Sequence, residues 1–240
     1  MRSELPYPDP QFLSRDTKLL LAARPSRNMY RMLAHAPSTL PAVLELTRAL
    51  LHDGRIPPTL RELAILRVGH LCGSSYEVHQ HRKIAAAVGL DPARIDGTAR
   101  DPAAATDAGY SEKEVLVLRF VEQVVRQTRA DPDLRDRIVN VLGLEQTMEL
   151  LVLVGTYAML ARVLENAGVE VEDGSGPPLS EVAQIFSWQA AGWQSRRSTA
   201  EDPATARGSP PAPSRRSAPP RRSAAAPNGA ASPPPPSRRR

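Results

Sequence analysis

Helix start and stop signals recur along residues 28–194, and this feature most constrains the fold. Apolar residues return with helical spacing nearly everywhere in this region, and no alternating apolar and polar run is bounded by hairpin turns. The first two expected helices cover about residues 28–35 and 38–52, and a third begins at residue 59. A fourth covers 74–89, and a single helical turn follows Pro92. The remaining expected helices cover 111–128, 131–143, 145–166 and 179–193. The sequence therefore predicts an all-α, single-domain bundle of about seven to eight helices.

Three helix starts match the capping-box pattern, in which a hydroxyl and a carboxylate satisfy each other's backbone amides. The pairs are Thr59 with Glu62, Ser74 with Glu77, and Ser111 with Glu114. Glycines mark the helix ends, since a left-handed residue often terminates a helix. Glu62 and Glu77 therefore have complete structural explanations as caps.

Charge and composition divide the chain into three parts. Residues 195–240 hold ten arginines against two acidic residues, a net +8, so the whole-chain +5 leaves −3 for residues 1–194. This tail is rich in Pro, Ala, Ser and Arg and lacks large apolar residues, so it cannot bury enough surface to offset its ordering entropy. We expect an extended leader over 1–27, a helical domain over 28–194 and a disordered tail over 195–240.

The arginine pairs of the tail suggest a nucleic acid or another anionic surface as one possible partner. No aromatic residue is interleaved with them for base stacking, so we favour a solvated extension without a nucleic-acid partner. The single cysteine, Cys72, excludes an internal disulfide and fits a reducing cytoplasm. The run from Leu150 to Ala161 is too short and too close to Glu149 and Arg162 to span a bilayer, so we expect no membrane contact.

Glu77 and His81 form the strongest proton-transfer pair that helix geometry alone predicts. They lie one turn apart on one helix face, where a carboxylate can orient an imidazole. His79 is about 200° round the helix from His81, so these two histidines cannot chelate one metal ion. We therefore expect acid–base chemistry and no metal site.

The chain resembles the carboxymuconolactone decarboxylase family, within the alkylhydroperoxidase-D-like superfamily, from roughly Tyr30 to Val171. Four motifs carry the resemblance: Arg-Glu-Leu-Ala-Ile-Leu-Arg-Val at 61–68, Gly-Ser-x-Tyr-Glu-x-x-x-His at 73–81, Ile-Ala-x-x-x-Gly-Leu at 84–90, and the helix at 157–166. The family consists of small all-α proteins that assemble as oligomers, and its members need no organic cofactor or metal. The resemblance thus implies an alkylhydroperoxidase-D-like bundle, no cofactor, and a homo-oligomer such as a trimer or hexamer.

Residue by residue, the resemblance places the family's acidic residue at Glu62 and its histidine at His81. The Cys-x-x-Cys pair of the thiol peroxidases would fall at Ser74 and Glu77, so this redox pair is missing. Such a chain looks like the decarboxylase-like branch, although Val78 replaces a tryptophan that commonly follows the glutamate there. Candidate substrate-binding residues are Ser74, Tyr76, Tyr157 and His70.

Three functions remain open from the sequence. The first is a cofactor-independent enzyme that decarboxylates, isomerises or cyclises a small carboxylated lactone or unsaturated acid, with His81 as acid, Glu77 orienting it and Glu62 relaying protons. The second is alkylhydroperoxidase or peroxiredoxin-type antioxidant activity at Cys72, although a lone thiol cannot form the intramolecular disulfide of that cycle. The third is a non-catalytic helical oligomer that binds a ligand or partner.

Overall fold

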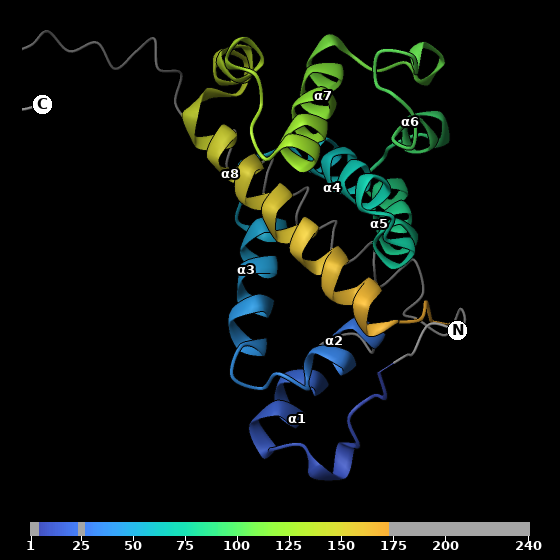
Figure 1. The fold of residues 1–240 in the computed structure, drawn as a ribbon, viewed down its shortest axis with the longest axis vertical. Helices are drawn as coiled ribbons and strands as arrows, with labels where there is room; N and C mark the ends of the chain where they lie inside the picture. Colours follow the sequence, from blue (N-terminus) through green and yellow to red (C-terminus); the bar gives the residue numbers. More distant parts are fainter. Residues whose placement is uncertain (1–4, 24–26, 173–240) are drawn as a thin grey trace, which may run out of the picture. The chain divides into compact units, whose positions relative to one another are not determined.

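Residues 5–23 and 27–172 are described by the structure, a computed structural model of the chain, and every regular element within these ranges is helical. The α-helices are α1 Arg15–Ala22, α2 Asn28–Leu33, α3 Leu40–His52, α4 Pro58–Cys72, α5 Ser75–Ala87, α6 Pro92–Gly97, α7 Glu112–Gln127 and α8 Pro132–Ala167. Short 3-10 helices cover Pro10–Phe12 and Thr106–Ala108. The predicted all-α class is confirmed (Figure 1).

Helix α4 is the centre of the bundle. Every residue from Leu60 to Gly69 is buried, so this helix has no solvent-exposed face over that stretch. It packs against α5, α7 and α8, and Figure 1 shows it behind α8 and beside α5. Any charged side chain on this part of α4 must therefore find its partner inside the protein.

Most expected helix boundaries are confirmed to within a few residues. The Ser111–Glu114 capping box is present, Ser74 and Asp91 cap α5 and α6, and Gly168 ends α8 in the left-handed conformation. Gly143 has a φ of 77° and breaks α8 where the sixth expected helix was to stop. Local capping chemistry sets these boundaries, because it depends on residues close in sequence.

Two expectations about helix starts are wrong. The leader is not extended throughout, because Arg15–Ala22 form α1 behind Ser14, whose hydroxyl accepts a bond from the Thr17 amide. Thr59 and Glu62 form no capping box, because α4 already begins at Pro58 with Pro57 as its N-cap. A proline suits the first helical turn, so the true start lies one residue before the threonine. The predicted helix at 179–193 and the tail lie outside the described residues.

The chain divides into two units, Met1–Ala200 and Glu201–Arg240, and all described residues lie in the first. Within it, α8 is long and apolar enough to cross a membrane by composition, but half of the apolar window is buried in the protein. Its buried side chains, such as Leu153 and Leu160, belong to the main hydrophobic core with Phe120 of α7. α8 therefore packs as a core helix along one of its faces.

Candidate active site

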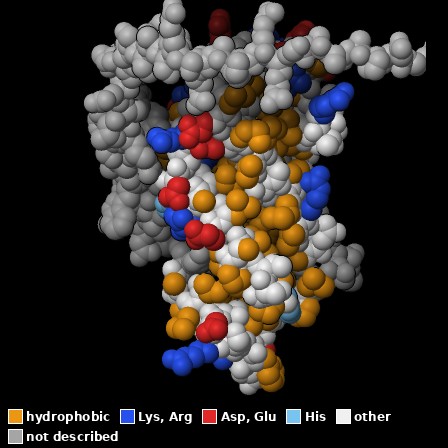
Figure 2. Space-filling view, turned by 90° about the vertical axis from the view of Figure 1, so that its left-hand side faces the viewer, with side chains coloured by type: hydrophobic (Ala, Val, Ile, Leu, Met, Phe, Trp, Pro, Cys, Tyr) orange, Lys and Arg blue, Asp and Glu red, His pale blue; other side chains and the backbone are white. Residues whose placement is uncertain are grey.

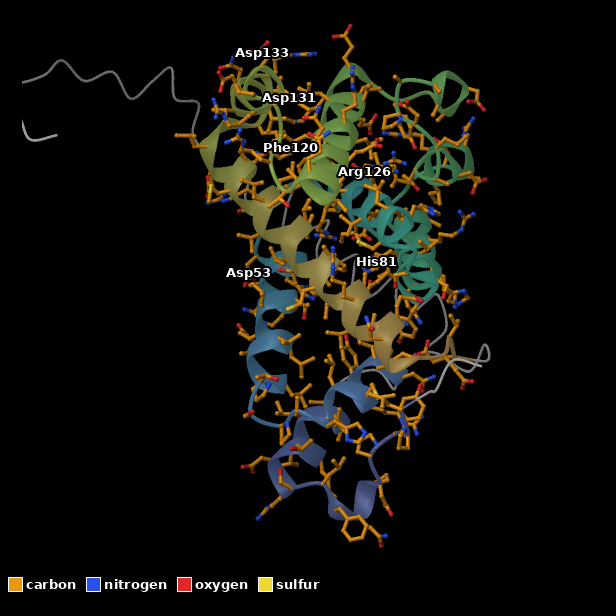
Figure 3. All side chains as sticks on the ribbon, viewed as in Figure 1. Asp53, His81, Phe120, Arg126, Asp131 and Asp133 are labelled. Carbon is orange, nitrogen blue, oxygen red and sulfur yellow. The ribbon has the colours of Figure 1, made fainter. Side chains whose placement is uncertain are left out.

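Glu62 and His81 form the central contact of the candidate site. Glu62 projects from α4 and His81 from α5, and the imidazole Nδ1 lies 2.7 Å from Glu62 Oε2. Both side chains are buried, and Figure 3 shows His81 on α5 in the middle of the bundle. The structure thus brings together the two residues that only the family resemblance had linked.

Gly69 explains how α4 and α5 approach closely enough for this contact. A Cβ at Gly69 would lie 3.0 Å from Val78 Cγ2 and 3.6 Å from Glu77 Cβ. The backbone of α4 therefore fits against the α5 turn that carries Glu77, two helical turns from Glu62. A small residue at this crossing keeps the two helices in register for the Glu62–His81 bond.

Glu77 lies on the opposite edge of the imidazole. Its Oε2 is 3.4 Å from His81 Nε2, and its other oxygen, Oε1, is buried without a hydrogen-bond partner. The Tyr157 ring from α8 meets the imidazole edge to face, with centroids 5.0 Å apart and planes at 87°. His81 is thus held between two carboxylates and an aromatic ring.

The environment of Glu62 favours its ionised form. Burial by itself would raise the pKa of this carboxyl, but the charge and hydrogen bond of His81 outweigh burial and lower it. Arg61 adds to this effect, because its Nε donates to Glu62 Oε1 at 3.1 Å. Glu62 is therefore a carboxylate that accepts a hydrogen bond from His81 Nδ1–H.

Glu77 experiences the opposite effect. Burial raises the pKa of its carboxyl, the His81 charge offsets this only in part, and the Glu62 charge raises it further. Burial likewise raises the pKa of Tyr157 well above its usual value, with further contributions from Glu77 and Glu62. Two carboxyl groups with opposite pKa shifts across one imidazole are an arrangement suited to proton transfer.

The two glutamates differ from their expected structural roles. Glu62 is not a helix cap, because its carboxylate contacts Arg61 and His81. The Glu77 amide donates to Ser74 Oγ at 3.5 Å, yet its carboxylate faces His81. The imidazole is oriented chiefly by Glu62, whose contact is shorter, and less by Glu77 than helix geometry had suggested.

The other predicted site residues are spread over the bundle. Ser74 is buried as the N-cap of α5, and the Tyr76 hydroxyl donates to Glu172 and accepts from the Met29 amide. His70 is partly buried near the end of α4, and burial together with the Arg67 charge lowers its pKa. Of the four proposed substrate-binding residues, Tyr157 is the one that the structure places against His81.

Sequence reasoning missed Arg61 as a site residue. Its side chain is buried, with Nε on Glu62 and Nη1 donating to the Leu51 carbonyl at 2.6 Å. A second buried arginine of α4, Arg67, similarly pairs with Glu122 and backbone carbonyls. The apolar residues around Arg61 could have indicated its role, because they predict a buried helix. A charged side chain in a buried helix needs a partner inside the protein.

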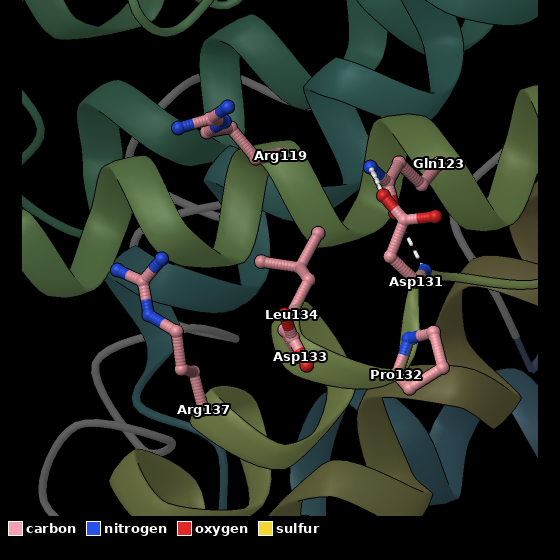
Figure 4. Close-up of a pocket in the computed structure, with 7 residues that line it drawn as sticks. All are labelled: Arg119, Gln123, Asp131, Pro132, Asp133, Leu134 and Arg137. Carbon is pink, nitrogen blue, oxygen red and sulfur yellow. Dashed lines mark hydrogen bonds between the residues drawn. The ribbon is translucent and has the colours of Figure 1, made fainter.

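A separate pocket of about 330 Å³ lies between α7 and the start of α8. Figure 4 shows Arg119 and Arg137 on one side and Gln123 bonded to Asp131 on the other. None of the predicted site residues lines this pocket. Among the described residues, no group of three or more His, Cys, Asp or Glu side chains is arranged to hold a metal ion.

The fold belongs to the class of all-α bundles built on the AhpD core. The structure titled alkylhydroperoxidase AhpD core, an uncharacterized peroxidase-related protein from Ralstonia eutropha JMP134, is 18% identical, with a TM-score of 0.62 over 72% of this chain and 94% of that one. An uncharacterized peroxidase-related protein from Silicibacter sp. TM1040 is 14% identical, with a TM-score of 0.59 over 72% and 92%. No curated protein matches the sequence.

Residues 37–123 match the model of the Carboxymuconolactone decarboxylase family. The matched segment contains three of the four motifs, so this part of the chain resembles the family, and the two solved structures share the AhpD-core fold. The matched segment includes Glu62, Glu77 and His81 but ends before Tyr157. The segment that matches the family model therefore contains the candidate proton-transfer residues of α4 and α5.

Proposed function

We propose that this protein is a cofactor-independent acid–base enzyme of the carboxymuconolactone decarboxylase type. Its substrate would be a small carboxylated lactone or a related unsaturated acid. The observation that carries this proposal is the buried His81 between Glu62 and Glu77, whose pKa values are shifted in opposite directions. The family match supports the substrate class.

The proton path follows from the two contacts of the imidazole. Ionised Glu62 accepts a hydrogen bond from His81 Nδ1–H, which leaves the imidazole Nε2 facing the Glu77 carboxyl. Glu77 then shares its proton with His81, and its buried, unpartnered Oε1 is left to meet a substrate. His81 and Glu77 together therefore hold one transferable proton.

Decarboxylation would use this proton at the second step. The bond between the substrate carbon and its carboxylate breaks, CO₂ leaves, and the electron pair passes into a conjugated carbonyl of the substrate. The same carbon then takes the proton held by Glu77 and His81, and solvent restores it. An isomerisation would use the same groups, with a proton removed from one carbon and returned to another.

The test combines a ligand screen with matched substitutions. Small lactones and unsaturated acids retained by the protein are identified by mass spectrometry, and turnover of a retained compound is measured. His81→Ala and Glu77→Gln should each lower kcat by about 10² to 10⁴. The control is Ser111→Ala, which removes a helix cap far from His81 in the sequence. Unchanged turnover in a folded His81→Ala protein would exclude the mechanism.

A thiol peroxidase function is the second candidate, and two observations favour it. The two solved structures compared above are described as peroxidase-related, and Cys72 Sγ lies 3.9 Å from Arg162 Nη1. The Cys72 thiolate would attack a peroxide oxygen, releasing an alcohol and leaving a sulfenic acid. An external thiol would then have to reduce it, because the chain has one cysteine.

The two candidates make opposite predictions for the same pair of variants. The peroxidase function requires that Cys72→Ser abolish consumption of an alkyl hydroperoxide with an added thiol reductant, and that His81→Ala retain a reactive thiol. The acid–base function requires that Cys72→Ser keep full turnover of the lactone or acid. Measuring both activities on both variants separates them.

A further inference from the structure

The pocket between α7 and the start of α8 contains two arginines that are unpaired among the described residues. Arg119 projects from α7 and Arg137 from α8, and Figure 4 shows both on the same side of the pocket. Neither guanidinium has a hydrogen bond or an ion pair with a described residue. The volume of about 330 Å³ is within the range of small-molecule pockets. The pocket therefore has room for a small ligand and presents two positive charges to it.

Neighbouring arginines on the same two helices are paired. Arg126 of α7 donates to Glu122 at 3.0 Å. Arg135 of α8 donates to Asp136 at 2.7 Å. A guanidinium group offers a fork of donors that matches the oxygens of a carboxylate or a phosphate. The two pocket arginines keep these donors available, which suits an oxyanion as their partner.

Two reciprocal hydrogen bonds fix the opposite wall of the pocket. Gln123 Nε2 donates to Asp131 Oδ2, and the Asp131 amide donates to Gln123 Oε1, both at 2.8 Å. These bonds hold the start of α8 on α7, so the pocket is formed before a ligand arrives. Asp131 Oδ1 and the Asp133 carboxylate have no hydrogen-bond partner among the described residues. Asp133 and Arg137 are four residues apart, a spacing that allows an ion pair on a helix, yet they form none.

Apolar side chains separate the two polar walls. Leu134 lies between them in Figure 4 and packs against the main hydrophobic core, and Pro132 lines the same pocket. The mixed lining differs from the face shown in Figure 2, where apolar side chains gather in a broad strip. A purely apolar ligand would take water from the charged groups of the pocket without replacing its hydrogen bonds. The occupant therefore needs polar groups for both walls and a carbon skeleton between them.

We propose that this pocket binds a small organic oxyanion that carries hydroxyl groups, such as a sugar acid or a sugar phosphate. Its carboxylate or phosphate accepts hydrogen bonds from Arg119 and Arg137. Its hydroxyl groups donate to Asp131 Oδ1 and to Asp133, and its carbon chain lies over Leu134. Since the two aspartates balance the two arginines in charge, the hydroxyl contacts are needed to favour this ligand over a plain anion.

The proposed ligand site is separate from the candidate active site. No residue of the Glu62, Glu77 and His81 cluster lines the pocket. The inference therefore does not rest on the proposed enzyme function. His81→Ala should bind the probes of the pocket with the same affinity as the wild-type chain.

The first test titrates the full chain with D-gluconate and with glucose 6-phosphate by calorimetry. We expect saturable binding of at least one, and the tighter of the two identifies carboxylate or phosphate as the preferred oxyanion. Arg119→Gln and Arg137→Gln should each raise its dissociation constant about tenfold or more. The matched control is Arg135→Gln, which removes the same charge outside the pocket and should leave the affinity unchanged. Absence of saturable binding would overturn the proposal, and so would binding to the arginine-rich tail, which none of these substitutions would weaken.

The second test measures the contribution of each part of the ligand. Hexanoate has the carboxylate and chain length of gluconate without its hydroxyl groups, and D-glucose has hydroxyl groups without an oxyanion. Both should bind about fivefold or more weakly than the preferred probe. Asp133→Asn should reduce the preference for gluconate over hexanoate, whereas Asp136→Asn, outside the pocket, should not. Equal affinities of the wild-type chain for gluconate and hexanoate would contradict the hydroxyl contacts and overturn the assigned ligand class.

Discussion

The two faces of α8 differ in how far they depart from the usual pattern of a globular protein, in which apolar groups are buried and charged groups exposed. The inner face packs Tyr157 against a buried imidazole that is flanked by ionisable groups, while the outer face exposes Val152 and Met159 to solvent. Polar groups are usually exposed and apolar groups buried, so each face gives up stability of the isolated chain. The proposed acid–base function would account for the ionisable cluster at the inner face, whereas the outer face is an exposed apolar row.

The largest expected effect comes from breaking the inner cluster. Glu62→Ala would leave Arg61 and His81 buried without their carboxylate, so we expect the free energy of unfolding to fall by about 3 to 5 kcal/mol. Urea unfolding at pH 7 measures this loss, and Glu62→Gln, which keeps the side-chain size, is the comparison variant. A loss below about 1 kcal/mol would show that the cluster behaves like an exposed ion pair.

Substitutions of two glycines compare the packing at the crossing of α4 and α5 with that on the exposed face of α8. Gly69→Ala places a methyl group 3.0 Å from Val78, whereas Gly155→Ala adds one in open space. We expect Gly155→Ala to gain about 0.5 to 1 kcal/mol from helix propensity. Gly69→Ala should be less stable than Gly155→Ala by about 1 to 3 kcal/mol. Equal unfolding free energies in dilute solution would contradict the close approach of α4 and α5.

The pH dependence of stability should differ in sign between the two glutamates. Burial raises the Glu77 pKa in the folded state, so its contribution is fully present below the unfolded pKa and is lost as pH rises through the folded pKa. Glu77→Gln should therefore be more stable relative to wild type at neutral pH than at pH 4. The measurement is urea unfolding at a series of pH values.

Glu62 is the control for this series. Its folded pKa is lowered, so its contribution is present above the unfolded pKa and is lost as pH falls through the folded one. The deficit of Glu62→Gln should accordingly be largest near neutral pH and shrink in acid. The same sign for both variants would contradict the opposite shifts.

The smallest expected effect lies on the outer face. Met148→Gln should change the free energy of unfolding of the chain in dilute solution by less than about 0.5 kcal/mol, because an exposed side chain makes few contacts. Leu150→Ala, two residues further along α8 and 1% exposed, should cost about 2 to 5 kcal/mol. Thermal or urea unfolding of both variants at low concentration measures the difference.

The α5 helix shows how far the sequence alone could predict the site. Ser74 and Gly89 marked its limits, and the i, i+4 spacing of Glu77 and His81 placed both on one face. The same local reasoning was wrong for Glu62, because a capping pattern with Thr59 matched a helix that starts at Pro58. Arg61 was missed because its partners include Leu51 and Glu62, which no spacing rule links to it.

The sequence by itself determined the helical class, most helix boundaries and the residues able to move protons, because periodicity and capping act between residues near each other in the chain. Only the tertiary structure decided which of those residues meet. The crossing of α4 and α5 at Gly69 brings Glu62 to His81, and the packing of α8 brings Tyr157 to the same ring and turns its second apolar face outward. Such contacts depend on long-range packing and on burial, which shift the two glutamate pKa values in opposite directions.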